Sequence, residues 1–507
     1  MEIIPIESIK PSTYNPRKAD EERLQMVELS LKKLGFILPI YSTVNGEILS
    51  GHQRQYVASK MGFKHIPVEW VDKELTLEKR KNINILFNQA TNEAPRSLTP
   101  QGMKKKLKTV NLQELADQIP DKDMDNPREI FRCYYAEDLP LDKVVEKNYL
   151  RFDNYYSKKN YNLMRVAKTM PLIVNKDYEI INGIGRISHI VTKKKKDENI
   201  KCVVLKDEEV EFADYMLNYV SMDFDIHNKY RDELRQNSFR RHIKKDIGIG
   251  TGFIAKLVKN PYTVKSKFSP NLKEAFKKEY GERIVDFGAG HMINTRILNK
   301  NGFYCIPFEP FVIDFDKFMK LDYEKSVEVC RNFLKEYQED SHFDTVFLHS
   351  VFNSVPFEED RQKILTILAE IADNDTKVIL WTQHVKAYIA ALNSSFTETS
   401  TKGSSFLDYE KNIVLADTFD KPKVQKYYDE KDLISLCRPY FQSIKTRVLN
   451  SMIYCELTKP IKPSKGELDE ALDFEFNLKH TEGGRLGLNK EAKKVFHKVR
   501  KDRESGV

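Results

Sequence analysis

The sequence repeats one short pattern, and this repeat constrains the fold more than any other feature of the chain. Residues 45–56 read NGEILSGHQRQY, and residues 177–188 read DYEIINGIGRIS. Four residues recur after a constant interval of 132 positions (179 − 47 = 132): Pro39, Glu47, Gly51 and Arg54 correspond to Pro171, Glu179, Gly183 and Arg186. Recurrence at a fixed interval indicates a duplicated structural unit. We therefore expect two similar modules in the first half of the chain.

The first copy has the pattern of a β-hairpin followed by a short helix. Asn45 and Gly46 separate two short apolar runs, and an Asn-Gly pair favours the type I′ turn of a two-residue hairpin. A helical pattern covers residues 52–61 and begins directly after Gly51. Backbone N–H groups are free where a strand becomes a helix, and the helix dipole attracts anions there. The sequence therefore predicts an anion site at Gly51.

Arg54 allows a functional and a structural interpretation of this turn. It falls in the first turn of the predicted helix, where its guanidinium can hold a phosphate with two hydrogen bonds. In the structural alternative, Gly51 serves a tight turn and Arg54 pairs with Glu47. The sequence leaves both interpretations open.

Three segments near the N-terminus resemble the ParB/sulfiredoxin N-terminal domain: NPR at 15–17, LKKLGFILPI at 31–40 and GEILSGHQRQYVASKMGFKHIPV at 46–68. The resemblance covers residues 1–110. It implies a small α+β module whose Gly-x-x-Arg turn binds a phosphate of DNA or of a nucleotide such as CTP or ATP. That role falls on Gly51, His52 and Arg54. The sulfiredoxin branch needs a cysteine where Ser50 and Gly51 stand, so a sulfinic-acid reductase is not expected.

The second copy, expected within residues 111–240, is more divergent. It keeps the hairpin, Gly183 and Arg186, but it has no NPR element and has Ile184 where the first copy has His52. We predict a second ParB-like module in which Gly183 and Arg186 are the candidate phosphate contacts. A copy that has kept only a structural role is the alternative.

Two glycine-rich segments follow, and the first matches a nucleotide-binding loop only by its letters. Residues 246–252 read DIGIGTG and follow RRHIKK, which is too charged for a buried parallel strand. We predict a helical linker or a DNA-binding helix-turn-helix over residues 241–264.

The second segment has the order of elements that a nucleotide-binding α/β unit needs. A short apolar strand ends on Asp286, Gly288 and Gly290 allow a tight turn, and a helix leads to a strand that ends on Glu309. Glu309 lies 23 residues after Asp286 (309 − 286 = 23). An acid at this strand end can accept hydrogen bonds from both ribose hydroxyls. The third glycine of a dinucleotide fingerprint is absent, which argues against NAD(P).

Further strands predicted at 343–349 and 376–383 and a closing hairpin at 441–459 complete a Rossmann-like domain. Over residues 265–460 the sequence resembles a class I S-adenosylmethionine-dependent methyltransferase. The segments SVFNSVP and FDKPKVQKYY are most similar to a methyltransferase group found in phages and DNA-modification gene clusters.

This second resemblance implies roles for six residues. Four of them would hold the cofactor S-adenosylmethionine: Asp286, Gly288, Gly290 and Glu309. His349 and Asn353 would face the methyl group and orient or deprotonate the acceptor. No D/N-P-P-Y/F/W motif and no Pro-Cys pair follow, so methylation of an exocyclic amine or of cytosine C5 is not implied.

The composition agrees with a soluble multidomain protein, and its modest basic excess is compatible with nucleic-acid binding without demonstrating it. The chain has 507 residues, a net charge of +8 and six scattered cysteines without metal-ligand spacing. It has no apolar run long enough to span a membrane. We expect a cytoplasmic protein with free cysteines and no metal site, whose lysine runs and basic C-terminal tail at 461–507 contact DNA phosphates.

The leading hypothesis is a multidomain α/β and α+β protein with two ParB/sulfiredoxin-like modules followed by a class I methyltransferase domain that acts on DNA or a nucleotide. One alternative is a binding protein whose methyltransferase fold holds the cofactor without turnover. Another is a ParB-like nuclease or nucleotide phosphotransferase with Glu47 as its general base.

Overall fold

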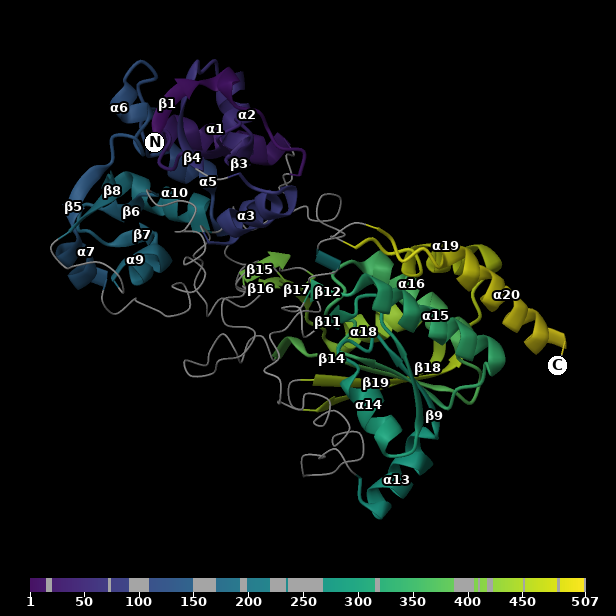
Figure 1. The fold of residues 1–507 in the computed structure, drawn as a ribbon. Helices are drawn as coiled ribbons and strands as arrows, with labels where there is room; N and C mark the ends of the chain where they lie inside the picture. The colour runs from purple at the N-terminus through teal and green to yellow at the C-terminus, as the bar shows by residue number, and fades with distance from the viewer. Residues whose placement is uncertain are drawn as a thin grey trace. The chain divides into compact units, whose positions relative to one another are not determined.

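A computed structural model describes residues 1–14, 21–71, 74–90, 109–148, 170–191, 198–218, 234–235, 268–314, 320–386, 405–408, 411–416, 423–449, 452–480 and 484–505. The chain divides into two compact units, Met1–Arg231 with Ala391–Lys423 and Asp232–Ala390 with Val424–Val507. Figure 1 shows the elements of both, and each unit is described by itself. The NPR element, the lysine runs at 104–106 and 193–196 and the predicted linker at 241–264 lie outside the described residues.

The first module of the first unit is a four-stranded mixed sheet with helices. Its elements are β1 (Glu2–Pro5), a 3-10 turn (Ile6–Ser8), α1 (Glu21–Leu34), β2 (Ile40–Thr43), β3 (Ile48–Ser50), α2 (His52–Lys60), β4 (His65–Val71) and α3 (Leu77–Ala90). The strand order is β1-β4-β2-β3. Strand β2 is parallel to β4, and the other two pairs are antiparallel.

The second module repeats this architecture. Two short helices lead into it, α5 (Leu112–Asp117) and α6 (Pro127–Ile130). Its elements are β5 (Glu137–Pro140), α7 (Leu141–Asn148), β6 (Leu172–Asn175), β7 (Ile180–Asn182), α9 (Ile184–Val191), β8 (Asn199–Leu205) and α10 (Asp207–Asn218). The strand order is β5-β8-β6-β7. Strand β6 is parallel to β8, and the other pairs are antiparallel, so the sense of every pairing matches the first module.

The two modules also agree in residue register. In the first hairpin Tyr41 pairs with Ser50, and in the second Ile173 pairs with Asn182. Both members of the pair are displaced by 132 positions (173 − 41 = 132; 182 − 50 = 132). Each hairpin has an irregularity at the next residue of its first strand. Because a slip of one residue would turn every side chain to the opposite face, this agreement shows that the repeated sequence folds into a repeated structure.

The modules share one hydrophobic core. Leu34 and Tyr41 of the first module pack in the same buried cluster as Ile173 and Phe212 of the second. Arg132, between the modules, donates from Nη2 to the carbonyl of Val204 at 2.7 Å. Its guanidinium also pairs with Glu209 of α10, which is buried and pairs with Lys122. The two modules are therefore one body within the first unit.

The second unit contains a six-stranded sheet with the order β10-β9-β13-β14-β19-β18. The strands are β9 (Arg283–Phe287), β10 (Tyr304–Phe308), β13 (Thr345–His349), β14 (Lys377–Gln383), β18 (Phe441–Leu449) and β19 (Met452–Pro460). The first four strands in this order are parallel. Strand β19 is antiparallel to both of its neighbours. This confirms the predicted Rossmann-like fold class with its closing hairpin.

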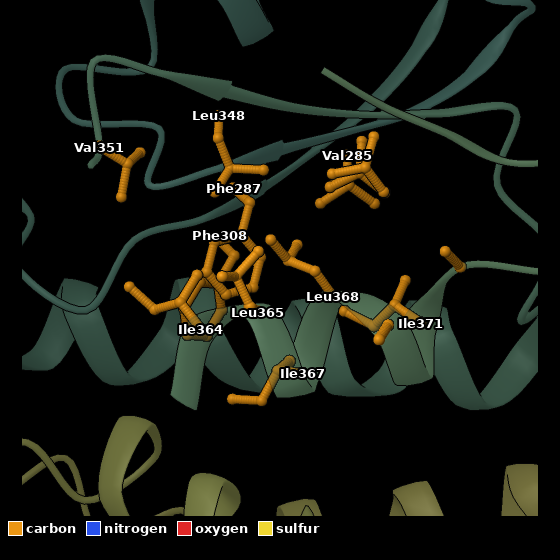
Figure 2. Close-up of a cluster of buried hydrophobic side chains, with 14 of the residues drawn as sticks. Val285, Phe287, Phe308, Leu348, Val351, Ile364, Leu365, Ile367, Leu368 and Ile371 are labelled. Atoms are coloured by element: carbon orange, nitrogen blue, oxygen red, sulfur yellow. The ribbon is translucent and has the colours of Figure 1, made fainter. Parts of the chain in front are cut away.

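Helices cover both faces of this sheet. They are α13 (Pro270–Tyr280), α14 (Ile293–Lys300), α15 (Tyr323–Glu339), α16 (Glu358–Ile371), α18 (Glu430–Cys437), α19 (Lys465–Glu475) and α20 (Asn489–Ser505). Side chains alternate between the faces along β9: Ile284 packs against α13 and α14, whereas Val285 and Phe287 point toward Leu365 and Leu368 of α16, as Figure 2 shows.

Short strands complete the described elements. Strand β11 (Ile313–Asp314) pairs with β12 (Lys320–Leu321), and β15 (Ser405–Asp408) pairs with β16 (Ile413–Ala416). Strand β17 covers Lys423–Lys426.

All six cysteines are free and buried. In the described stretches of the chain, no helix combines the length and the apolar character that crossing a bilayer requires.

The C-terminal segment differs from the basic tail that the sequence analysis expects. Helices α19 and α20 bury Leu472 and Phe496 in the core beneath the sheet. Arg500 pairs with the buried Glu370 of α16, and Arg503 donates to the carbonyl of Ile371 at 3.1 Å. The high content of lysine and arginine hides an apolar stripe at helical spacing, and cations stabilise the carboxyl end of α16. The folded unit therefore extends beyond the predicted boundary at residue 460.

Candidate functional site

The glycine turn between β9 and α14 lies at the carboxyl ends of parallel strands. Gly288 adopts a φ of 74°, and a Cβ added to it would lie 2.5 Å from Cγ2 of Val351. The N–H groups of Gly288 and Ala289 donate to the carbonyl of Phe308 at 2.8 and 3.0 Å. Met292, in the left-handed region, begins α14. Open α/β sheets bind their ligands at this edge, so the turn has the position that a nucleotide site requires.

Asp286 and Glu309, the two predicted acids, are both buried at this edge. Oδ2 of Asp286 accepts a hydrogen bond of 2.8 Å from Oγ1 of Thr295, and burial raises the pKa of Asp286 to about 6. Oε2 of Glu309 accepts from the N–H of Gly290 at 2.5 Å, and Oε1 accepts from that of Phe311 at 2.8 Å. Burial raises the pKa of Glu309 to about 7. Each carboxylate oxygen has a further lone pair, so Glu309 can hold the turn and still accept from a ligand.

A pocket adjoins the glycine turn and Glu309. Its lining combines apolar side chains with three charged ones, Arg235, Glu309 and Glu475. Nη2 of Arg235 donates to both carboxylate oxygens of Glu475 at 3.1 and 3.2 Å. The sequence analysis missed both partners. Glu475 lies on the apolar stripe of α19, seven residues after Leu468 (475 − 468 = 7). An acidic residue on an apolar stripe is a sequence signal that could have revealed Glu475. Arg235 has no such signal.

The two predicted catalytic residues do not line this pocket. His349 is half-buried at the end of β13, next to Ser350, which adopts a φ of 60°. Asn353 is buried: Nδ2 donates to Oε1 of Gln425 at 3.0 Å, and its carbonyl accepts from the N–H of Lys426 at 2.8 Å. These contacts hold residues 425–428 against the loop after β13. A catalytic role of His349 and Asn353 stays a prediction.

In the first module, the partner of Arg54 differs from the one that the structural alternative names. Glu47 pairs with Arg80 of α3, not with Arg54. Nη1 of Arg54 instead donates to the carbonyl of Leu38, just before β2. The guanidinium of Arg54 lies beneath Gly51, where an added Cβ would be 3.2 Å from Nη2. Arg54 thus ties the helix to the hairpin while its side chain stays half-buried.

His52 occupies the start of α2, beside the same turn. It is buried, and its Nε2 lies 2.6 Å from Oγ of Ser12. Gly51, at a φ of 98°, precedes it. The structure therefore brings together the three residues Gly51, His52 and Arg54 that the ParB-like resemblance assigns to phosphate, and adds Ser12 to them.

In the second module, the equivalent arginine is closed off. Arg186 has no exposed surface. Its Nη2 donates to the carbonyl of Pro171 at 3.0 Å and to Oδ1 of Asn182 at 3.1 Å. Gly183 adopts a φ of 120°, and an added Cβ would lie 2.8 Å from that Nη2. The arginine fills the interior of the turn and presents nothing to a phosphate.

A pair of asparagines supports both hairpins, and the sequence analysis missed them. Nδ2 of Asn84 in α3 donates to the carbonyl of Leu49 at 2.7 Å. Nδ2 of Asn218 in α10 donates to the carbonyl of Ile181 at 3.0 Å. Each accepting residue is two positions before the turn glycine (51 − 49 = 2; 183 − 181 = 2). The repeat therefore includes the helix that follows the return strand.

No protein-family model matches the sequence, and no curated protein matches it. Among solved structures, the chain is similar to the PH0226 protein from Pyrococcus horikoshii OT3 (15% identity, TM-score 0.27, covering 38% of this chain and 88% of that chain). It is similar to a SAM-dependent methyltransferase from Bacteroides fragilis in complex with S-adenosyl-L-homocysteine (12% identity, TM-score 0.25, 45% and 97%). It is also similar to the chromosome-partitioning protein ParB from Caulobacter crescentus complexed with CTP-gamma-S (22% identity, TM-score 0.18, 23% and 68%). Likenesses with TM-scores this low carry no function over to this chain.

Proposed function

We propose that the second unit binds S-adenosylmethionine at the glycine turn and Glu309 and transfers its methyl group to DNA or a nucleotide. The observation that carries this proposal is Glu309. Its buried carboxylate stands at the carboxyl end of β10, is fixed by the N–H of Gly290, and keeps lone pairs for ribose hydroxyls. Gly288 lines the pocket beside Glu309, and Asp286 holds the start of α14 through Thr295.

The cofactor supplies an already activated methyl group, so the work of the protein is alignment of the acceptor with that group. Glu309 would orient the nucleoside of the cofactor, and the glycine turn would fix how deeply that nucleoside enters the pocket. His349 and Asn353 are proposed to position the acceptor, from the loop that follows β13. The chain segments 1–110 and 111–240 are proposed as the tandem modules that precede this catalytic domain.

The experiment is calorimetry with S-adenosylmethionine and S-adenosylhomocysteine. We expect heat of binding with wild type and a large loss of affinity in Glu309→Gln, with Glu456→Gln on β19 as a matched control that keeps wild-type affinity. Burial raises the pKa of Glu309 to about 7, so the ionised fraction, and with it the affinity for the positively charged cofactor, should rise between pH 6 and 8, a span of about one unit either side of that pKa. Absence of heat with either ligand on wild type would refute the cofactor.

For the first unit, we propose that the turn of the first module holds a phosphate of DNA or of a nucleotide. The position of the half-buried residue Arg54 in the first turn of α2, next to the buried His52, supports this, because the amino end of a helix attracts anions. Affinity for duplex DNA should then fall steeply with salt, because each neutralised phosphate releases counterions. The nuclease alternative needs Glu47 as a free base, and the ion pair with Arg80 engages that carboxylate.

A cofactor-binding protein without turnover is the second candidate. The hydrogen bond from Nδ2 of Asn353 to Oε1 of Gln425 favours it, because it engages one end of the side chain that a catalytic role would use. Mass spectrometry of nucleosides from cells with and without the protein separates the two. A new methylated nucleoside supports catalysis, and cofactor binding without one supports the second candidate.

A further inference from the structure

Arg235 lines the pocket beside Glu309, and neither resemblance assigns it a role. Its side chain is 5% exposed and pairs with Glu475, whose side chain is 1% exposed. Nε of Arg235 also lies 3.9 Å from Oδ2 of Asp360, which is fully buried. We name Arg235, Glu475 and Asp360 the Arg235 latch. It joins the pocket to two covering helices, since Asp360 belongs to α16 and Glu475 to α19.

The charges of the latch are interdependent. The cation of Arg235 lowers the pKa of both Glu309 and Glu475, against the rise that burial causes. A buried carboxylate left without a cation is strongly destabilising, so the displacement of Arg235 is favoured when another cation takes its place. S-adenosylmethionine carries two positive groups, a sulfonium and an ammonium, and can provide that replacement.

The pocket has almost no room while Arg235 forms part of its wall. Its cavity volume, taken as the space open to the centre of a water molecule, is about 10 Å³, which is roughly what one water molecule needs. A nucleoside held by Glu309 cannot enter without the displacement of a lining side chain. Arg235 is the cationic side chain among the lining residues, and its removal would leave the acidic wall that a cationic ligand fits.

We propose that Arg235 is a built-in competitor for the cofactor site, which occupies it in the ligand-free protein and is displaced by the positive charge of S-adenosylmethionine. The proposal rests on the cofactor site proposed above. It makes Arg235 a determinant of affinity: the observed dissociation constant is the intrinsic one divided by the fraction of molecules in which the latch is open.

The test measures the affinity of S-adenosylmethionine by calorimetry in wild type, Arg235→Met and Arg235→Lys. If the latch is open in about a tenth of wild-type molecules, Arg235→Met should bind about tenfold tighter. Arg235→Lys keeps the competing cation and should bind close to wild type. The full chain is used throughout.

Loss of Arg235 removes the cation that pairs with Glu475 and lies near Asp360 and can prevent folding, so a second variant is needed. The double variant Arg235→Met with Glu475→Gln removes one charge of each sign. Its affinity is measured with S-adenosylhomocysteine, which has no sulfonium. The change in affinity then reports mainly the space that the arginine side chain leaves in the pocket. The matched control is Arg500→Met with Glu370→Gln, a pair between α20 and α16. It should leave both affinities unchanged.

Tighter binding in Arg235→Met and in Arg235→Met with Glu475→Gln, with Arg235→Lys close to wild type and the control unchanged, supports the latch. Equal affinity in wild type and variants overturns the latch and leaves the cofactor site standing. Weaker binding also overturns it, because Arg235 would then be a direct contact of the ligand. Absence of binding in wild type and in every variant overturns the proposed cofactor itself, and the latch with it.

Discussion

The two glycine turns of the first unit have the same backbone and different surroundings. Both have a glycine in the left-handed region and an arginine three residues later whose guanidinium lies beneath that glycine. Arg54 is half-buried, with His52 and Ser12 beside the turn. Arg186 is fully buried and is held by Asn182. The comparison teaches that the glycine-arginine pair is first a structural device, and that phosphate binding depends on what surrounds it.

The largest expected effect is a loss of folding stability, and it should be greater at Gly183 than at Gly51. In Gly183→Ala the new Cβ would lie 2.5 Å from Cδ2 of the buried Leu172 and 2.8 Å from Arg186. The left-handed backbone costs about 1–2 kcal/mol and the crowding roughly another 1–3 kcal/mol. In Gly51→Ala the new Cβ would lie 3.0 Å from Cγ1 of Ile40 and 3.2 Å from Nη2 of Arg54. This variant should therefore lose mainly the stability that the left-handed backbone costs. Urea unfolding measures both, and equal losses would break the comparison.

Next in size is the stability cost of the buried arginine. Arg186→Ala removes several hydrogen bonds in a closed interior, leaves acceptors unsatisfied, and should lower the free energy of unfolding by roughly 2–4 kcal/mol. Arg54→Ala, half-buried, should cost about half as much. Thermal unfolding of both variants tests this, with the exposed Lys176→Ala as a control near wild type. A larger loss in Arg54→Ala would contradict the assignment of roles.

Ligand binding should show the reverse ranking. Arg54→Ala removes a charge-assisted contact with phosphate, worth roughly 1.5–3 kcal/mol, so affinity for nucleotide or duplex DNA should fall tenfold or more. Arg186→Ala, measured where it is folded, should keep wild-type affinity. Cofactor binding at Glu309 should be unchanged in both. Unchanged nucleotide and DNA affinity in Arg54→Ala would make the first turn structural as well.

The smallest effects should come from the asparagines that both modules keep. Asn84→Ala removes a buried hydrogen bond to the first hairpin and should cost about 1 kcal/mol. Asn218→Ala should cost about 2 kcal/mol, because Asn218 also accepts from Nδ2 of Asn182. Hydrogen exchange of the two hairpins would show whether each loss is confined to its own module. Loss of hydrogen-exchange protection in both hairpins from either variant would instead indicate that the shared core transmits the destabilisation between the modules.

Several features could be predicted from the sequence because they depend on local backbone demands. An Asn-Gly turn, a glycine before a helix and an acid at a strand end have preferred conformations whatever surrounds them. The hairpins, the turn at Gly288 and the strand that ends before Glu309 therefore lie where the sequence places them. The C-terminal helices were missed because a high density of lysine and arginine hid an apolar stripe.

The sequence by itself determined the duplication and its register, since the side-chain period of a strand permits no slip, and it determined the order of strands and helices around Glu309. Only the tertiary structure decided the partners of the charges. Arg54 bonds a backbone carbonyl instead of Glu47, Glu47 pairs with Arg80, and Arg235 meets Glu475, which is 240 positions away along the chain. Ion pairs have no sequence period, and burial decides which pairs form because an unpaired buried charge is so costly.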